Sequence, residues 1–489
     1  FGSLLLDPTN ITIVEGGNNP SELAANNEFA DFGVNNTINN NTINTATANV
    51  ILQASNDITF NAPVNIAANG VGLTAEANNN INVNANITSN QGNVTLLADR
   101  DNSGAGAFIM TNAAINTNGG NFIGSGKGSN TSTSGVNLIK STITASGGTI
   151  ELTGVGRDGV EQGQGINIEG NSVVETTGVG TVSLAGTSGA GSCSGDCENH
   201  GIVIINGSVV SSENGKISFI GKGASSNGDT NHGIYILLNG SVESTGTGSI
   251  EMTGTTEATA STSNTSVGNE GISIVGGGKV ISDTGNITMT GTGGNGESES
   301  NGNQGILVLD PNSEIKSSSG DISLTGTARG IGSNNHGIWI GDRTGEEQEN
   351  NGKITSDNGN ITLIGQGGGT DIENIGIFLD GNGVVGTTGT GKIVLNGTGG
   401  NGTDENHGIL VQGNSKVSAI NGEIDLFGKG GGNTTDGFNN NGISIFDRGL
   451  VETTGTGKIV LNGTGGNGTD ENHGILVQGN SKVSAINGE

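Results

Sequence analysis

A tetrad of the form Gly-Ile-x-apolar returns through most of this chain at intervals of 32 to 39 residues. A second apolar position follows eight residues later in most units, and then a third segment of the form x-Ile-x-Leu/Met/Phe-x-Gly. Alternation of apolar and polar residues is typical of half-buried strands, because successive side chains point to opposite faces. The repeat therefore predicts three short strands per unit. The tetrads begin at Gly165, Gly201, Gly233, Gly271, Gly305, Gly337, Gly376, Gly408, Gly442 and Gly474.

The distances between the three segments show which parts of the unit are fixed. Ile409 to Val417 spans 8 residues and Val417 to Ile424 spans 7, whereas the return to the next tetrad varies from 16 to 22. One unit departs from this pattern through an insertion around residues 341–351. A solenoid tolerates insertions only where they project from the stack and leave the strand register intact.

This pattern predicts an all-β, right-handed parallel β-helix of about 14 coils, with three short strands and one variable loop per coil. Leucine-rich repeats are disfavoured because their pattern is absent, and helical repeats because interior Gly destabilises helices. Propeller blades need four longer strands. We place the third strand of successive coils at Val50, Val71, Val94, Phe122, Ile150, Val182 and onward to Ile459.

Coil length and chain ends suggest three regions. Residues 1–48 are expected to be a lead-in segment that follows a missing secretion domain, because the chain begins with Phe1 and has no leader pattern. Residues 49–130 are expected to form short coils, and residues 131–489 long coils of about 34 residues. We expect the last region to be truncated, because natural solenoids protect their ends and this one stops within a strand segment.

Charge excludes some classes of partner. The formal net charge is -29, so phosphate backbones and anionic membrane surfaces would be repelled, and nucleic acid is not expected as a partner. No stretch approaches the roughly 18 apolar residues of a transmembrane helix, and we expect no transmembrane segment.

An Asn occupies the same turn position before nine of the tetrads. Asn tolerates positive φ, and its amide both donates and accepts, so stacked coils are expected to form a hydrogen-bonded ladder with a structural role. All five His residues follow such an Asn directly, and we expect them to face outward rather than to bind metal. The predicted ladder consists of Asn199, Asn231, Asn269, Asn303, Asn335, Asn374, Asn406, Asn440 and Asn472.

The two cysteines, Cys193 and Cys197, lie four residues apart in a Gly-containing stretch. A small disulfide there is plausible and would suit an oxidising compartment. His200 follows closely, but three candidate ligands at non-standard spacing do not predict a metal site.

No catalytic or cofactor-binding residues stand out, and we predict that the chain is not an enzyme. Polysaccharide-active enzymes need convergent carboxylates and sugar-binding platforms, whereas the acidic residues here are scattered through variable loops. The loop 399–404, repeated at 465–470, matches half of a calcium-binding nonapeptide, so only weak, incidental calcium binding is expected. Residues 387–423 and 453–489 are identical, so function in that region cannot depend on a unique residue.

Three segments near the start carry a family resemblance: residues 2–13 (GSLLLDPTNITI), 50–60 (VILQASNDITF) and 93–107 (NVTLLADRDNSGAGA). They look like exoproteins of the filamentous-haemagglutinin type, especially the large cyanobacterial ones. The resemblance covers about residues 1–130. It implies export by two-partner secretion through an outer-membrane transporter, and it carries no catalytic residues. The Asn-Pro-Asn motif of the family's secretion domain does not occur here.

The resulting hypothesis is the structural shaft of a secreted or surface-attached bacterial adhesin, which displays variable loops to a surface receptor or glycan not identifiable from the sequence. Many weak contacts along such a stack would combine through multivalency. Two alternatives remain: a polysaccharide-active β-helix enzyme, and the stalk of a contact-dependent toxin delivery protein.

Overall fold

The computed structural model describes residues 8–17, 35–190, 198–224, 230–257, 268–295, 302–342, 351–432 and 437–488. Cys193 and Cys197 lie outside these residues. The chain divides into two compact units. Unit 1 comprises Phe1–Ala190 and Gly201–Phe219, and unit 2 comprises Gly191–His200 and Ile220–Glu489.

Unit 1 is built from parallel strands in three sheets, here called A, B and C. Sheet B contains β2 (Asn35–Asn39), β1 (Asn10–Val14), β4 (Ile58–Phe60), β7 (Ile81–Val83), β10 (Phe108–Thr111), β13 (Val136–Ile139), β16 (Ile166–Glu169) and β19 (Ile202–Ile204). Sheet C contains β5 (Val64–Asn69), β8 (Ile87–Asn90), β11 (Ala114–Asn116), β14 (Thr142–Ala145), β17 (Val173–Thr176) and β20 (Val209–Ser212). Sheet A contains β3 (Val50–Ala54), β6 (Leu73–Ala77), β9 (Val94–Leu97), β12 (Phe122–Lys127), β15 (Ile150–Val155) and β18 (Val182–Thr187).

Unit 2 repeats this arrangement, and β21 (Ile217–Gly223) contains the boundary between the units. Sheet B contains β22 (Ile234–Ile236), β25 (Ile272–Ile274), β28 (Ile306–Leu309), β31 (Ile338–Gly341), β34 (Ile377–Leu379), β37 (Ile409–Val411), β40 (Ile443–Ile445) and β43 (Ile475–Val477). Sheet C contains β23 (Ser241–Ser244), β26 (Lys279–Ser282), β29 (Glu314–Ser317), β32 (Lys353–Ser356), β35 (Val384–Thr387), β38 (Lys416–Ala419), β41 (Leu450–Thr453) and β44 (Lys482–Ala485). Sheet A contains β24 (Ile250–Thr256), β27 (Ile287–Thr292), β30 (Ile322–Thr327), β33 (Ile361–Gln366), β36 (Ile393–Thr398), β39 (Ile424–Lys429) and β42 (Ile459–Thr464).

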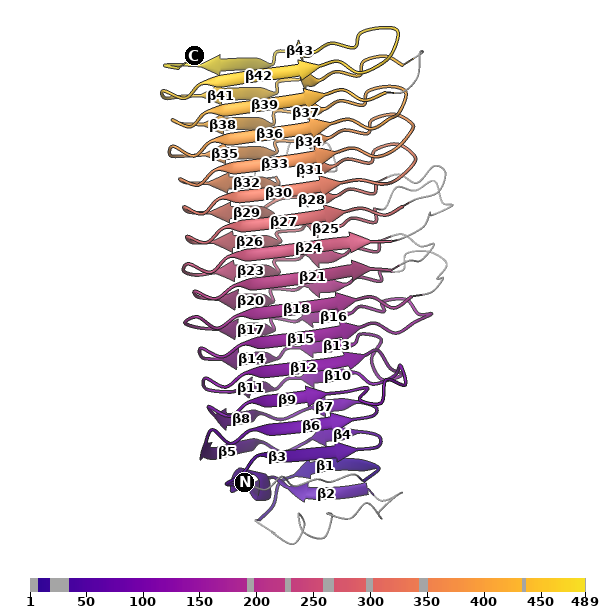
Figure 1. Cartoon of the computed structure of the whole chain (residues 1–489), viewed down its shortest axis with the longest axis vertical. Helices are drawn as coiled ribbons and strands as arrows, with labels where there is room; N and C mark the ends of the chain where they lie inside the picture. Colours follow the sequence, from indigo (N-terminus) through magenta and orange to yellow (C-terminus); the bar gives the residue numbers. More distant parts are fainter. Residues whose placement is uncertain are drawn as a thin grey trace. The chain divides into compact units, whose positions relative to one another are not determined.

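Each coil passes through sheets B, C and A in turn, and within each unit successive coils stack in register (Figure 1). In unit 2, for example, Ile306 pairs with Ile338, which pairs with Ile377. Alternate side chains of these strands are buried in a continuous interior of Ile, Val and Leu. The predicted parallel β-helix with three strands per coil is therefore confirmed.

The described residues hold 14 strands of the third-segment type, from β3 to β42, which is the expected number of coils. One predicted anchor is wrong: Leu73, rather than Val71, pairs with Val50 and with Val94. Val71 lies in the turn that precedes β6 and is also buried. Both positions are apolar in the sequence, so apolar character alone does not show which of them is the strand residue.

The region expected as a lead-in contributes to unit 1. Strand β1 lies between β2 and β4 in sheet B, and Ile11 pairs with Ile58. The short helix α2 (Asn40–Asn44) follows β2, and its buried residue Ile43 has no exposed surface.

The glycine that ends each third segment is required by close contact with the tetrad. A Cβ at Gly326 would lie 2.1 Å from the carbonyl oxygen of Gly337 and 2.7 Å from Cγ1 of Ile338. The corner between sheets A and B therefore has no room for a side chain, which explains why both repeat motifs contain Gly at this corner.

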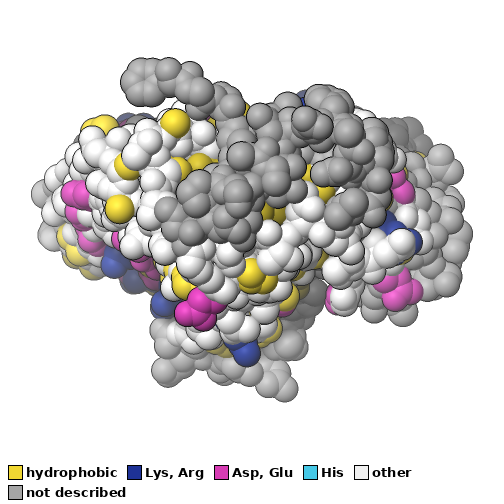
Figure 2. All heavy atoms as spheres, turned by 90° about the horizontal axis from the view of Figure 1, so that it is seen from below, with side chains coloured by type: hydrophobic (Ala, Val, Ile, Leu, Met, Phe, Trp, Pro, Cys, Tyr) yellow, Lys and Arg dark blue, Asp and Glu magenta, His cyan; other side chains and the backbone are white. Residues whose placement is uncertain are grey.

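Figure 2 shows a face on which uncharged polar side chains and backbone predominate, with acidic and basic side chains scattered among them. No described helix is long and apolar enough to span a bilayer.

Candidate functional site: the outer face of sheet B in unit 2

The structure brings the nine predicted ladder asparagines into one column at the start of sheet B, in which all but the half-buried Asn472 are buried. In seven pairs of ladder residues from neighbouring coils, the Oδ1 atom of one Asn accepts the backbone N–H of the Asn one coil earlier. The Asn335 Oδ1 atom, for example, accepts both the backbone N–H of Asn303 at 3.0 Å and its side-chain Nδ2 at 3.1 Å. The remaining direct bonds run from Asn199 to Asn231, Asn231 to Asn269, Asn335 to Asn374, Asn374 to Asn406, Asn406 to Asn440, and Asn440 to Asn472.

The positive φ that the sequence analysis links to the ladder Asn occurs at a different residue of this turn. None of the ladder asparagines has positive φ; the residue before the Asn adopts it in most coils. That residue is Glu in four coils, with φ of 47° at Glu198, 56° at Glu373, 57° at Glu405 and 53° at Glu471. Left-handed backbone is uncommon for residues other than Gly, Asn and Asp, and such outliers cluster at functional sites.

The histidines lie on the outer side of sheet B, where His336 packs against Trp339 and Phe378, but four of the five are buried there rather than exposed. His200, His232, His336 and His407 are buried, and only His473, in the last coil, is exposed.

Three of the buried histidines link consecutive coils. The Nδ1 atom of His200 accepts the backbone N–H of His232 at 3.1 Å. In the same way, Nδ1 of His336 accepts from Ile375 at 3.3 Å, and Nδ1 of His407 accepts from Asn441 at 3.2 Å. An accepting Nδ1 requires a neutral ring with its proton on Nε2.

Burial keeps these rings neutral. It lowers the pKa of His336 to about 3 and the pKa of His407 to about 4. The pKa of His200 is also well below its usual value, first because of burial and then because of the positive charge of His232. An imidazolium would be desolvated at these positions and would lose its bond to the next coil.

His232 has a different partner. The carboxylate of Glu270 in the next coil contacts its Nδ1 atom in a buried ion pair, while the backbone N–H of Glu270 lies 3.3 Å from the same nitrogen. Both contacts cannot be hydrogen bonds at once. We assign the proton to Nδ1, because a charge-assisted bond to a carboxylate is stronger than a long bond from an amide.

Aromatic and aliphatic residues form a second apolar layer outside the sheet. They occupy the x position of the tetrad, which the alternation rule predicts to be polar. Trp339 stacks on Phe378 with ring centroids 5.5 Å apart, and His336 packs against both rings. Leu307 is fully buried at the same position. The apolar residues at position x of several tetrads are the feature of the sequence that indicates this layer.

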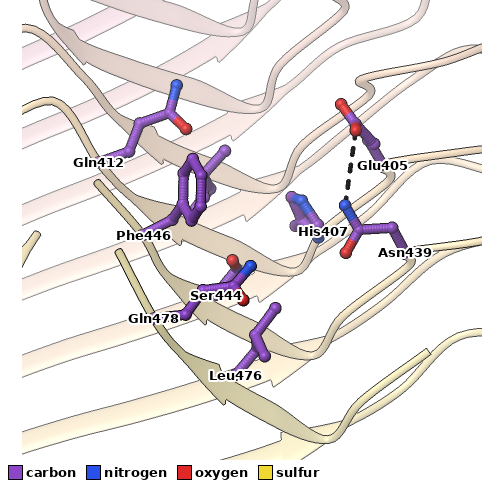
Figure 3. A pocket seen from close by; sticks show the side chains of 9 residues that line it. Glu405, His407, Gln412, Asn439, Ser444, Phe446, Leu476 and Gln478 are labelled. Carbon is purple, nitrogen blue, oxygen red and sulfur yellow. Dashed lines mark hydrogen bonds between the residues drawn. The ribbon is translucent and has the colours of Figure 1, made fainter. Parts of the chain in front are cut away.

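Farther along unit 2 this outer face is hollowed into a groove of about 150 Å³ (Figure 3). Leu410, Ser444 and Leu476, the middle residues of β37, β40 and β43, lie side by side along it. The groove therefore crosses three coils. The remaining lining residues are Glu405, His407, Gln412, Asn439, Phe446 and Gln478.

A second polar ladder, at the start of sheet A, is not among the features predicted from the sequence. The Oδ1 atoms of Asn286, Asp321 and Asn360 accept the backbone N–H of the following coil at 2.9, 2.8 and 2.9 Å. The recurring dipeptide Gly-Asn/Asp immediately before the third-segment Ile was the signal available in the sequence.

In the loop that resembles part of a calcium-binding nonapeptide, one carboxylate is bonded within the protein. The Asp404 Oδ1 atom accepts the backbone N–H of Phe438 at 3.0 Å. Over the part of the chain that the structure describes, no three His, Cys, Asp or Glu side chains are grouped so as to hold a metal ion.

No family model and no curated protein matches this chain.

Proposed function

We propose that this chain is the structural shaft of a secreted or surface-attached bacterial exoprotein, similar in role to filamentous-haemagglutinin-type adhesins and exported by two-partner secretion through an outer-membrane transporter. In this role its stacked coils hold variable connections at a fixed spacing, where they contact other cells or surfaces.

One observation carries the proposal: insertions are concentrated in one connection per coil. In unit 2 the passage from sheet B to sheet C is short, as between β37, which ends at Val411, and β38, which begins at Lys416; the one exception is the passage from β31 to β32. The passage from sheet A to sheet B varies, since β36 ends at Thr398 before β37 begins at Ile409, whereas β24 ends at Thr256 and β25 begins only at Ile272. A constant scaffold with one variable side is suited to display.

A polysaccharide-active enzyme is the alternative, and one carboxyl pair is relevant to it. The pKa of Glu373 is raised, first by burial and then by the charge of Glu405, with which its side chain forms a hydrogen bond. Glycosidases hold their two carboxyl groups about 5 to 9 Å apart so that the sugar, or the sugar and a water molecule, fit between them. Carboxyl groups in direct contact leave no such space, so this pair supports a structural role.

Two measurements test the proposal. Antibodies against the chain, applied to intact cells of the organism that produces it, are expected to bind without permeabilisation and to lose binding when the transporter gene is deleted. The purified protein is expected to release no reducing sugar or unsaturated uronate from a polysaccharide panel. Labelling that appears only after lysis would contradict surface display, and turnover would contradict the structural role.

A further inference from the structure

We propose that the groove over β37, β40 and β43 binds an extended, neutral, β-linked glycan, with one pyranose ring stacked on Phe446. This inference rests on the proposed function, because it names the kind of surface that the shaft would contact.

The lining combines an aromatic face with hydrogen-bonding groups of both kinds. Phe446 is 40% exposed although it is a large apolar side chain. The amides of Gln412 and Gln478 lie in the matching positions one coil before and one coil after it, and Figure 3 shows all three along one side of the groove. A sugar ring offers an apolar C–H face to an aromatic ring and hydroxyl groups, which both donate and accept, to flanking amides.

The opposite side of the groove is oriented before any ligand arrives. Glu405 and Asn439 both have left-handed backbone, with φ of 57° each, and the Asn439 amide donates to the Glu405 carboxylate at 3.5 Å (Figure 3). The Nδ1 atom of His407 is occupied by the N–H of Asn441, so its Nε2–H remains as a donor. Preorganised polar groups reduce the ordering cost of binding.

Charge and backbone bonding exclude other ligand classes. Among the residues that the structure describes, the groove is lined by Glu405 and by no Lys or Arg, and the whole chain carries a net charge of -29, so an anionic glycan would be repelled. A polypeptide strand would bind by adding to a sheet edge. The groove instead lies over the face of three strands whose backbone groups are already paired with one another.

Equivalent lining residues recur along the groove at a distance close to the length of a disaccharide. Gln412 and Gln478 are equivalent residues of the two identical segments, two coils apart, as are Leu410 and Leu476. Two coils correspond to about 10 Å at the usual strand separation. This is close to the length of an extended disaccharide, so a β-1,4-linked chain would present equivalent hydroxyl groups to the two glutamines while the ring between them lies on Phe446.

The test uses the purified chain with β-1,4-linked hexaoses of glucose, mannose and N-acetylglucosamine, measured by saturation-transfer NMR and titration calorimetry. We expect at least one of them to bind, and maltohexaose, whose α-1,4 linkage curves the chain, to bind less. Phe446→Ala should weaken binding about tenfold. The matched control is Phe427→Ala, because Phe427 in β39 is 36% exposed, lies outside the groove and should leave affinity unchanged.

Failure of the glycan proposal can be distinguished from failure of the proposed shaft function. Absence of binding to all three β-1,4 hexaoses would overturn the glycan proposal, as would equal affinity in Phe446→Ala and wild type with circular dichroism unchanged. Binding of a carboxymethylated unfolded polypeptide that is lost in Phe446→Ala would assign the groove to protein instead. Surface display is measured separately on intact cells and does not depend on any of these results.

Discussion

The imidazole of His232 lies almost parallel to that of His200, with ring centroids 4.9 Å apart and an interplanar angle of 4°. The backbone of the later coil donates to the ring of the earlier one, so each neutral histidine acts as a link between coils. The buried interior of unit 2 is thus supplemented by a column of polar links on the outer face of sheet B. Several of these links depend on protonation.

Acid should weaken unit 2 through its histidines. Burial holds the pKa of His336 at about 3 and of His407 at about 4 in the folded state, below the usual value of about 6.5 for the unfolded chain. A folded pKa that is depressed means that the unfolded state binds more protons. The stabilisation is therefore complete above about pH 6.5 and is lost as the pH falls towards 4 and then 3.

The double variant His336→Gln, His407→Asn isolates this effect, because Gln304 and Asn441 occupy the same position in other coils. Urea unfolding of wild type and variant between pH 7 and pH 4 is the measurement. The wild-type midpoint should fall more steeply with acid than that of the variant. Parallel pH profiles would show that the histidines are not responsible.

Trp339 should report the titration of His336 directly. It is the only Trp in the chain, and its ring lies 5.3 Å from the His336 ring in an edge-to-face arrangement. A charged imidazolium quenches a neighbouring indole, so Trp fluorescence should change near the folded-state pKa of about 3 and not near 6.5. His336→Gln should abolish this step, and a transition near pH 6.5 in wild type would mean that the ring is accessible to solvent.

The strands were predictable because each coil repeats the same apolar alternation and must keep its register to stay in the stack. Ile338 and Ile340 face the interior as the period-two rule requires. The rule does not extend to His336, which lies in a turn, or to Trp339, which is apolar on a face expected to be polar. The outer layer forms because an aromatic ring of one coil packs on a ring of the next.

The groove was not predictable from spacing. Gln412, Phe446 and Gln478 lie 34 and 32 residues apart, and nothing local to any one of them indicates a site. Their proximity follows only from parallel stacking in register. The sequence predicts binding in the variable connections. The groove contains residues from the ends of those connections, such as Glu405, and also residues of the sheet B strands.

Gly326 should not tolerate any side chain. A Cβ there would lie 2.1 Å from the Gly337 carbonyl oxygen, a backbone atom that cannot move without breaking the sheet corner. Gly326→Ala should therefore lower the free energy of unfolding of unit 2 by about 3 kcal/mol. Gly386→Ala is the control, since its nearest contact would be at 3.4 Å and its φ is not left-handed. Equal thermal midpoints for the two variants would refute the close-contact explanation of the repeat glycines.

Removing one rung of the asparagine ladder should be costly although no apolar contact is lost. In Asn335→Ala the buried backbone N–H and side-chain amide of Asn303 lose the Oδ1 atom that accepts both of them. Desolvated donors left without that acceptor should destabilise unit 2 by about 1 to 3 kcal/mol. Asn396→Ala, on the exposed face of β36, should change stability by less than about 0.5 kcal/mol. Urea unfolding at pH 7 compares the two variants, and an Asn335→Ala midpoint as high as that of Asn396→Ala would mean that the ladder does not contribute to stability.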